Sequence, residues 1–271
     1  MKTPGELLSL QGKVVVVTGG AGILGRHFCP ALAAQGASVA VLDLVADEAE
    51  KVAAAIRAEG GQAVAVACDV SDPASAETAV QTVIDAFGRI DVLLNNAASK
   101  GKDLDAFFAP YEEFSLQTWR DITAVNIDGM FLMSQAVGRR MVAQKSGSII
   151  QSSSIYGIMG ADKRIYEGSF YLGRQINTPA VYAASKAAVV GLTKYLATYW
   201  ADAGIRVNTV TFGGIESGQN ETFKQRYGAR VPMGRMGQPD ELIGAILYLA
   251  SDASSYVTGQ NLIIDGGLSA W

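Results

Sequence analysis

Residues 14–25 read Val-Val-Val-Val-Thr-Gly-Gly-Ala-Gly-Ile-Leu-Gly, an apolar run that ends in a glycine-rich turn. An unbroken β-branched run is typical of a strand buried on both faces. Glycines let the backbone approach a pyrophosphate, and a helix that starts there supplies free N–H groups and its positive dipole end. Placed after a first strand and before a helix, the turn predicts a dinucleotide site at Gly19, Gly22, Ile23 and Leu24. A tight turn without a ligand is the alternative.

Short apolar runs alternate with helical patterns along the rest of the chain. We expect strands at Val14–Thr18, Ser38–Asp43, Ala63–Cys68, Asp91–Asn95, Ser148–Ser152, Arg206–Val210 and Asn261–Ile264. We expect helices at Ile23–Gln35, Asp47–Glu59, Pro73–Phe87, Thr118–Gln144, Pro179–Ala203 and Pro239–Ser251. Such alternation predicts an α/β fold, a doubly wound parallel sheet (Rossmann fold) of about seven strands with helices on both faces. No linker or repeat interrupts it, so residues 1–271 are expected to form a single dinucleotide-binding and catalytic domain.

Composition excludes several classes of protein. Lys and Arg number 22 against 26 Asp and Glu, a net charge of −4, and no basic stripe is present, so we expect no nucleic acid partner. One histidine, His27, and two distant cysteines, Cys29 and Cys68, argue against a metal site. With no apolar stretch of membrane-spanning length and no apolar run at the N-terminus, we expect a cytoplasmic protein without membrane contact.

Asp43 ends the second predicted strand, 18 residues after Gly25. A carboxylate at this place accepts hydrogen bonds from an adenosine ribose and repels a 2′-phosphate. No Arg or Lys follows in Leu44-Val45-Ala46. The sequence therefore favours NAD over NADP as cofactor, and the alternative for Asp43 is a helix cap.

Tyr182 and Lys186 are four residues apart in a predicted helix, which places them on one face, one turn apart. An ammonium beside the phenol is expected to lower the pKa of Tyr182 from its usual value of about 10. Tyr182 would then act as a general acid and base near neutral pH.

The chain resembles the short-chain dehydrogenase/reductase family over nearly its whole length. The matching segments occur in family order: Thr18-Gly19…Gly25, Asp69-Val70, Asn95-Asn96-Ala97-Ala98, Val125-Asn126, Ser153-Ser154, Tyr182…Lys186 and Tyr256-Val257-Thr258-Gly259-Gln260…Asp265-Gly266-Gly267. The chain departs from the family pattern at two places in particular. Ile23 occupies the family's second glycine position, and Phe212 replaces a proline before Gly213.

The resemblance implies a catalytic role for each of four residues. Tyr182 would exchange a proton with the substrate oxygen, and Lys186 would hold the nicotinamide ribose and tune Tyr182. Ser154 would hydrogen-bond the substrate oxygen; it is chosen over Ser152 and Ser153 because two residues and then Gly157 follow it, as in the family. Asn126 would support a water relay toward Lys186.

The resemblance also implies further cofactor contacts. Asp69 would bond the adenine with Val70 packed beside it, Asn95 would sit against the adenosine, and the backbone of Ile215 would meet the carboxamide. Related proteins pair the helices at 118–144 and 179–203 across subunits, so a homotetramer, or at least a homodimer, is expected.

Two long irregular segments, Ser99–Ser115 and Ile155–Thr178, are expected to border the ligand-binding end of the sheet. Polar groups in the second segment favour a small polar substrate, a sugar, polyol or sugar acid; its alternative role is a lid or a subunit contact. Three functions follow: an NAD-dependent dehydrogenase of a polar secondary alcohol, a ketone or 3-oxoacyl reductase using NAD(P)H, and, remotely, a non-catalytic dinucleotide-binding protein.

Overall fold

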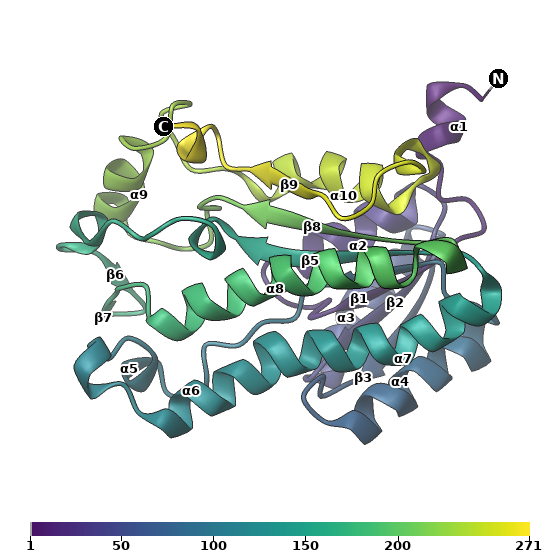
Figure 1. The fold of residues 1–271 in the computed structure, drawn as a ribbon, viewed down its shortest axis with the longest axis horizontal. Coiled ribbons are helices and arrows are strands. Elements are labelled where there is room, and N and C mark those ends of the chain that lie inside the picture. The colour runs from purple at the N-terminus through teal and green to yellow at the C-terminus, as the bar shows by residue number, and fades with distance from the viewer. Residues whose placement is uncertain (1) are drawn as a thin grey trace.

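The computed structural model describes residues 2–271, and its central feature is a parallel sheet of seven strands. The strands lie in the order β3-β2-β1-β4-β5-β8-β9, so the chain winds outward from β1 in both directions (Figure 1). Their bounds are β1 Val14–Thr18, β2 Ser38–Asp43, β3 Gln62–Ala67, β4 Val92–Asn95, β5 Gly147–Ser154, β8 Ile205–Phe212 and β9 Asn261–Ile264. The predicted α/β fold class is confirmed.

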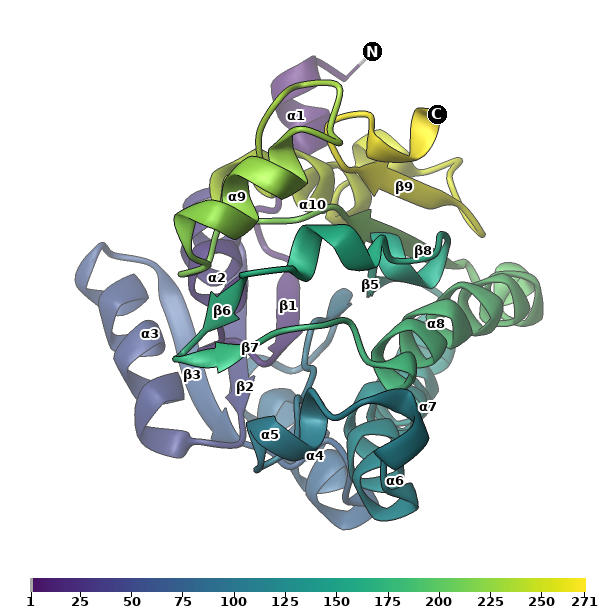
Figure 2. The same cartoon turned by 90° about the vertical axis from the view of Figure 1, so that its left-hand side faces the viewer.

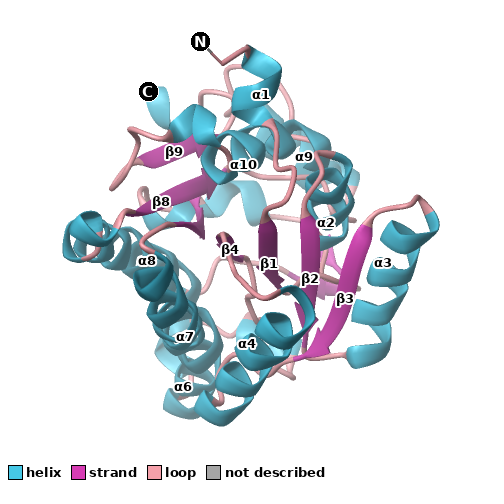
Figure 3. Cartoon of the chain, turned by 90° about the vertical axis from the view of Figure 1, so that its right-hand side faces the viewer, coloured by secondary structure: helices cyan, strands magenta, loops and turns pink. Residues whose placement is uncertain are grey.

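Helices cover both faces of this sheet (Figure 3). One core cluster joins the sheet to α2 (Gly25–Ala34), α3 (Ala46–Ala58) and α10 (Ile243–Ala250). The other joins the opposite face to α4 (Pro73–Phe87), α7 (Gly129–Gln144) and α8 (Ala180–Tyr199). Side chains of β1 alternate between the two clusters, which is why its valine run is buried throughout.

The structure also differs from the sequence prediction in its helices. The single helix expected over 118–144 is α6 (Leu116–Thr123), a π-helical turn at Ala124–Asp128 and then α7. Three short helices, α1 (Pro4–Leu8), α5 (Leu104–Phe107) and α9 (Glu221–Gly228), and the two-stranded hairpin of β6 (Phe170–Tyr171) and β7 (Arg174–Gln175) were not predicted. Single 3₁₀ turns occupy Tyr111–Glu113, Ile155–Gly157, Lys163–Tyr166, Ala201–Ala203, Pro239–Leu242, Asp252–Ser254 and Leu268–Ala270.

The carboxyl ends of the strands carry the irregular segments. β5, β8 and β9 all point toward the end of the molecule where α5, α9 and the β6–β7 hairpin gather (Figures 1 and 2). Ligands of open α/β sheets bind outside the carboxyl ends of the strands. The two long segments therefore border that end, as predicted.

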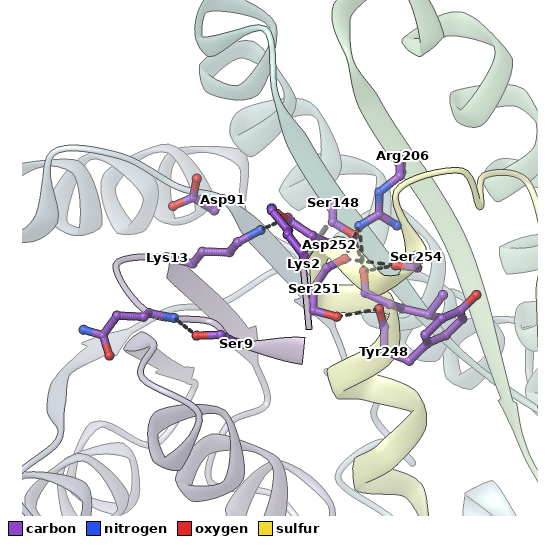
Figure 4. A network of polar contacts seen from close by, with 12 residues as sticks. Lys2, Ser9, Lys13, Asp91, Ser148, Arg206, Tyr248, Ser251, Asp252 and Ser254 are labelled. Atoms are coloured by element: carbon purple, nitrogen blue, oxygen red, sulfur yellow. Dashed lines mark hydrogen bonds and ion pairs between the residues drawn. The ribbon is translucent and has the colours of Figure 1, made fainter. Parts of the chain in front are cut away.

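The opposite end of the sheet is held by a polar network (Figure 4). Arg206 donates to the carbonyls of Leu249 and Ser251 at the end of α10, over 3.0 and 3.2 Å, where a cation complements the helix dipole. Burial lowers the pKa of Arg206. Asp252 accepts from Lys2 and Lys13, which ties the N-terminal segment to the same place. This network stabilises the fold away from the ligand-binding end.

Candidate active site

The turn requires glycine at two positions, because neighbouring backbone atoms leave no room there for a side chain. Gly19 has a left-handed φ of +60°, and a Cβ there would lie 2.9 Å from the Cα of Ala97. A Cβ on Gly25 would lie 2.2 Å from the carbonyl oxygen of Gly19. Leu24, the N-cap of α2, provides no side-chain cap, so the start of the helix is left open. Such an open helix start suits an anion.

The turn opens onto a cavity of about 600 Å³ at the carboxyl ends of the strands. Gly19, Gly22, Ile23 and Leu24 of the turn line it. The volume is in the range of ordinary small-molecule and cofactor sites. The other predicted site residues that line it are Asp43, Asp69, Val70, Ser154, Tyr182, Lys186 and Ile215.

Asp43 lies at the end of β2 and lines the cavity beside the turn. One carboxylate oxygen accepts from the N–H of Ala21 at 3.0 Å and the other from the N–H of Val45 at 3.2 Å. These two bonds fix the carboxylate, and each oxygen keeps lone-pair capacity for a further donor. The fixed negative charge is placed where a ribose hydroxyl could donate and a phosphate would be repelled.

Asp69 and Val70 follow β3 and line the same part of the cavity. The Asp69 carboxylate accepts from the N–H and the hydroxyl of Ser71, over 2.9 and 2.6 Å. The backbone N–H of Asp69 in turn donates to Ser75 of α4. Asp69 is therefore anchored by the loop it belongs to, with its remaining acceptor capacity available at the cavity wall.

Ser154, Tyr182 and Lys186 face one another across the cavity. Ser154 ends β5, and Tyr182 and Lys186 lie on α8. The Nζ of Lys186 donates to the carbonyl of Ser152 at 3.1 Å and lies 5.9 Å from the centre of the Tyr182 ring. The close approach of β5 to α8 depends on Gly157, where a Cβ would lie 2.6 Å from the backbone carbon of Lys186.

The expected lowering of the Tyr182 pKa is wrong for the protein without bound ligand. Burial raises the pKa of Tyr182, and the nearby Ser154 hydroxyl only partly offsets this. Burial also lowers the pKa of Lys186 to about 8. Desolvation of the phenolate outweighs the ammonium, because Lys186 donates to the Ser152 carbonyl and not to the phenol oxygen.

Asn126 lies in the π-helical turn and is fully buried behind the cavity wall. Its side-chain oxygen accepts from the N–H of Ser99 at 2.8 Å, and its amide donates to the Ser185 hydroxyl at 3.4 Å. Ser185 in turn donates to the carbonyl of Tyr182. Asn126 therefore connects the segment after β4 to the helix that carries Tyr182 and Lys186. Single π turns are frequent at functional sites.

Asn95 does not lie where the resemblance implied. It is buried inside the sheet, where its amide donates to the carbonyl of Met130 and to the side chains of Ser134 and Gln151. The neighbouring Asn96 lines the cavity instead and donates to the carbonyls of Thr18 and Gly19, each at 3.2 Å. The expected contact of Asn95 with adenosine is thus wrong, since its side chain is turned away from the cavity.

Several further residues that line the cavity were not predicted from the sequence. Tyr156 and Tyr227 add phenols near Tyr182, and Lys100 and Gln219 add polar groups at the same end. No pattern in the sequence marked them, because they lie in or next to long loops. Tyr227 accepts a hydrogen bond from the N–H of Gly214, which holds its ring against the wall.

The 155–178 segment is tied to α9 and to the 99–115 segment. Glu167 pairs with Arg226 of α9 at 3.3 Å, and Arg174 of the hairpin pairs with Asp105 of α5 at 2.6 Å. Asn177 donates to the carbonyl of Phe108 at 2.8 Å. These contacts hold the two segments and α9 together at the carboxyl ends of the strands.

Comparison with known proteins agrees with this arrangement. The model of a family described as enoyl-(acyl carrier protein) reductase matches residues 19–269. D-threitol dehydrogenase of Mycolicibacterium smegmatis is 39% identical over 95% of this chain and 93% of its own length. The 3-oxoacyl-[acyl-carrier-protein] reductase FabG of Thermotoga maritima is 36% identical (96% and 99% covered), as is 5-keto-D-gluconate 5-reductase of Escherichia coli (97% and 98%).

Solved structures give the same picture. A short-chain type dehydrogenase/reductase from Mycobacterium marinum superposes with a TM-score of 0.87 at 34% identity, with all of both chains covered. A gluconate 5-dehydrogenase from Burkholderia cenocepacia, in complex with NADP and tartrate, superposes at 0.88 and 32% identity over 99% of this chain and 100% of that one. The chain belongs to the short-chain dehydrogenase/reductase family, a family of oxidoreductases that use a nicotinamide dinucleotide.

Proposed function

We propose that this protein is an NAD-dependent dehydrogenase of a small polyol, sugar or sugar acid, with residues 1–271 acting as one dinucleotide-binding and catalytic domain. The observation that carries the chemistry is the meeting of Ser154, Tyr182 and Lys186 in the cavity that the glycine turn opens onto. The same meeting argues against a dinucleotide-binding protein without turnover, because such a protein needs no proton-transferring group.

The residues present fit a dinucleotide. The open start of α2 and the glycine backbone would hold the pyrophosphate. Asp43 would accept from the adenosine ribose, Asp69 and Val70 would flank the adenine, and the backbone of Ile215 would meet the carboxamide. The chemistry that a bound dinucleotide supplies is hydride acceptance, together with a positive charge on its oxidised ring.

Tyr182 would take the proton of the substrate hydroxyl at its phenol oxygen, and Ser154 would hold that hydroxyl in place. Burial keeps the phenol protonated before ligands bind, so we expect proton acceptance only when positive charge is added beside Tyr182. Lys186 would hold the nicotinamide ribose. Asn126 would support a water relay toward Lys186 through the segment that it anchors.

Asp43 supports NAD as the cofactor, since its carboxylate is fixed beside the turn by two backbone N–H groups. Against this stands the gluconate 5-dehydrogenase of similar fold, whose structure holds NADP. Two relatives named for threitol and 5-keto-D-gluconate favour a polar substrate, and so do the phenols, Gln219 and Lys100 in the cavity.

A second candidate is a ketone or 3-oxoacyl reductase that uses NAD(P)H. The relative named as a 3-oxoacyl-[acyl-carrier-protein] reductase favours it, as does the raised pKa of Tyr182, which suits a proton donor.

One panel separates the candidates. Threitol, glucitol and gluconate are offered with NAD or NADP, and an acetoacetyl thioester with NADH or NADPH, and the absorbance of reduced nicotinamide is followed. We expect oxidation of at least one polyol or sugar acid with NAD. Turnover of the thioester alone would favour the reductase, and cofactor binding without any turnover would favour the binding protein.

A further inference from the structure

The charged side chains of the cavity are divided between its two ends. Asp43 and Asp69, the carboxylates among the residues that line it, follow β2 and β3 at the adenosine end. Two cations line it, and they lie on the other side of β1 in the sheet order: Lys100 follows β4, and Lys186 is bonded to Ser152 of β5. Lys100 follows Ser99, whose backbone is bonded to Asn126 and through Ser185 to the helix of Tyr182. The end of the cavity that holds Ser154 and Tyr182, which we call the substrate end, is therefore positive.

Only one of these two cations is available to a substrate. Lys186 is 4% exposed, and its Nζ is bonded to the Ser152 carbonyl. Lys100 is exposed at the edge of the cavity, and its Nζ lies 4.2 Å from the centre of the Tyr171 ring in the β6–β7 hairpin. A cation–π contact of this kind positions the ammonium without neutralising its charge.

The acidic side chains nearest to Lys100 in sequence are already bonded elsewhere. The carboxylate of Asp103 caps α5 by accepting from the N–H groups of Asp105 and Ala106. Asp105 pairs with Arg174. Partial burial lowers the pKa of Lys100, and no acidic group raises it. Within residues 2–271, Lys100 thus lines the edge of the cavity as a cation without a carboxylate partner.

We propose that Lys100 binds a carboxylate of the substrate, so that the enzyme acts on a polyhydroxy acid in preference to a neutral polyol. A partly desolvated ammonium forms a charge-assisted hydrogen bond with a carboxylate. A phosphate would call for more N–H donors and cations than this end of the cavity offers. The phenols of Tyr156 and Tyr227, which line the same cavity, suit the hydroxyls of such an acid. The proposal rests on the proposed function for its reaction but not for its binding step.

The test compares D-gluconate with D-glucitol, an acid and a neutral polyol with the same carbon skeleton. Three variants are made: Lys100→Met, which keeps the apolar stem; Lys100→Arg, which keeps the charge; and Lys102→Met, which removes an exposed charge that does not line the cavity. Two quantities are measured: the ratio of kcat/KM for gluconate to that for glucitol, and the Kd of gluconate for the NADH-bound protein by calorimetry.

Loss of a charged hydrogen bond predicts that Lys100→Met lowers the kcat/KM ratio and weakens gluconate binding, each by about 10- to 100-fold. Lys100→Arg should keep both within about threefold of the wild type, and Lys102→Met should change neither, because Lys102 does not line the cavity. A Lys100→Met variant with the ratio and the gluconate Kd within about twofold of the wild type would overturn the proposal, as would a wild-type protein that does not bind gluconate.

The two readouts separate this proposal from the proposed function. If both compounds are oxidised and Lys100→Met does not change the ratio, the substrate-binding proposal fails and the dehydrogenase stands. If no polyol or sugar acid of the panel is oxidised but gluconate binding depends on the charge at position 100, the proposed reaction fails and the carboxylate site stands.

Discussion

Replacement of Lys186 with methionine should stabilise the protein without ligand while removing its activity. Lys186 is 4% exposed and makes a single hydrogen bond, to the Ser152 carbonyl, and no acidic partner offsets its desolvation. Its pKa falls from 10.5 to about 8 on folding. A fall of about 2.5 units corresponds to about 3 kcal/mol of lost stability at neutral pH. Methionine keeps most of the stem and removes the charge.

The sign of the pH dependence follows from the lowered pKa. Below pH 8 both the folded and the unfolded protein hold the Lys186 proton, so the full penalty is present. Between pH 8 and 10.5 only the unfolded chain holds it, and the penalty shrinks as pH rises. Methionine also removes the bond to Ser152, worth about 1 kcal/mol. The net gain near neutral pH is therefore about 2 kcal/mol, or about 4–8 °C in Tm for a chain of this size.

The assay is thermal unfolding of the cofactor-free protein near neutral pH and again about two units higher. Lys194→Met, an exposed position on the same helix, is the control and should change Tm by no more than about 1 °C. A Lys186→Met variant that unfolds below the wild-type Tm near neutral pH, or whose gain does not shrink at the higher pH, would refute the reasoning.

Three further outcomes follow from the structure. Asp43→Ala should reduce the preference for NAD over NADP, measured as the ratio of the two Kd values, by about tenfold or more. The substitution removes both the ribose acceptor and the charge that opposes a 2′-phosphate. Wild-type protein that binds NAD and NADP equally would contradict this. Asp252, whose pKa its lysine partners hold at about 2, should contribute stability above pH 3.8 that is lost as pH falls toward 2. Asp252→Asn should reduce this acid-dependent loss of unfolding free energy by no more than about 1 kcal/mol, because the ion pairs of Asp252 are exposed. A variant whose stability falls with pH as the wild type's does would contradict this prediction. Three aromatic side chains are exposed on α7 and α8: Phe131, Tyr195 and Tyr199. Such apolar exposure favours a homotetramer, or at least a dimer. A mass near 28.4 kDa by light scattering at micromolar concentration is that of one chain and would contradict assembly.

The sequence predicted the sheet well where a strand is buried along its whole length, as in the unbroken valine run of β1. The predicted bounds of β1 and β2 agree with the structure at both ends. The helices were harder, because apolar spacing does not register a π turn such as Ala124–Asp128 within a long periodic segment. The hairpin at 170–175 is too short to show a strand period.

The candidate site was predictable where sequence spacing fixes geometry. Tyr182 and Lys186 share a helical face, so their meeting follows from the sequence. The direction of the Tyr182 pKa shift did not, because it depends on burial and on where the Lys186 ammonium points. Neighbouring residues along a strand face opposite ways, so only one of Asn95 and Asn96 can point at the cavity. The sequence does not show which of the two it is. Lys100 was missed because it reaches the cavity from a long loop.

The central claim, that Tyr182 transfers the proton in a nicotinamide-dependent reaction, is tested most directly by Tyr182→Phe. The variant removes one oxygen and leaves the ring in place. With the best substrate of the panel, kcat should fall by about 10² or more, while the Kd of NAD stays within about twofold. Tyr195→Phe, exposed on the same helix, should behave as wild type. A Tyr182→Phe enzyme within about threefold of the wild-type kcat would show that another group carries the proton.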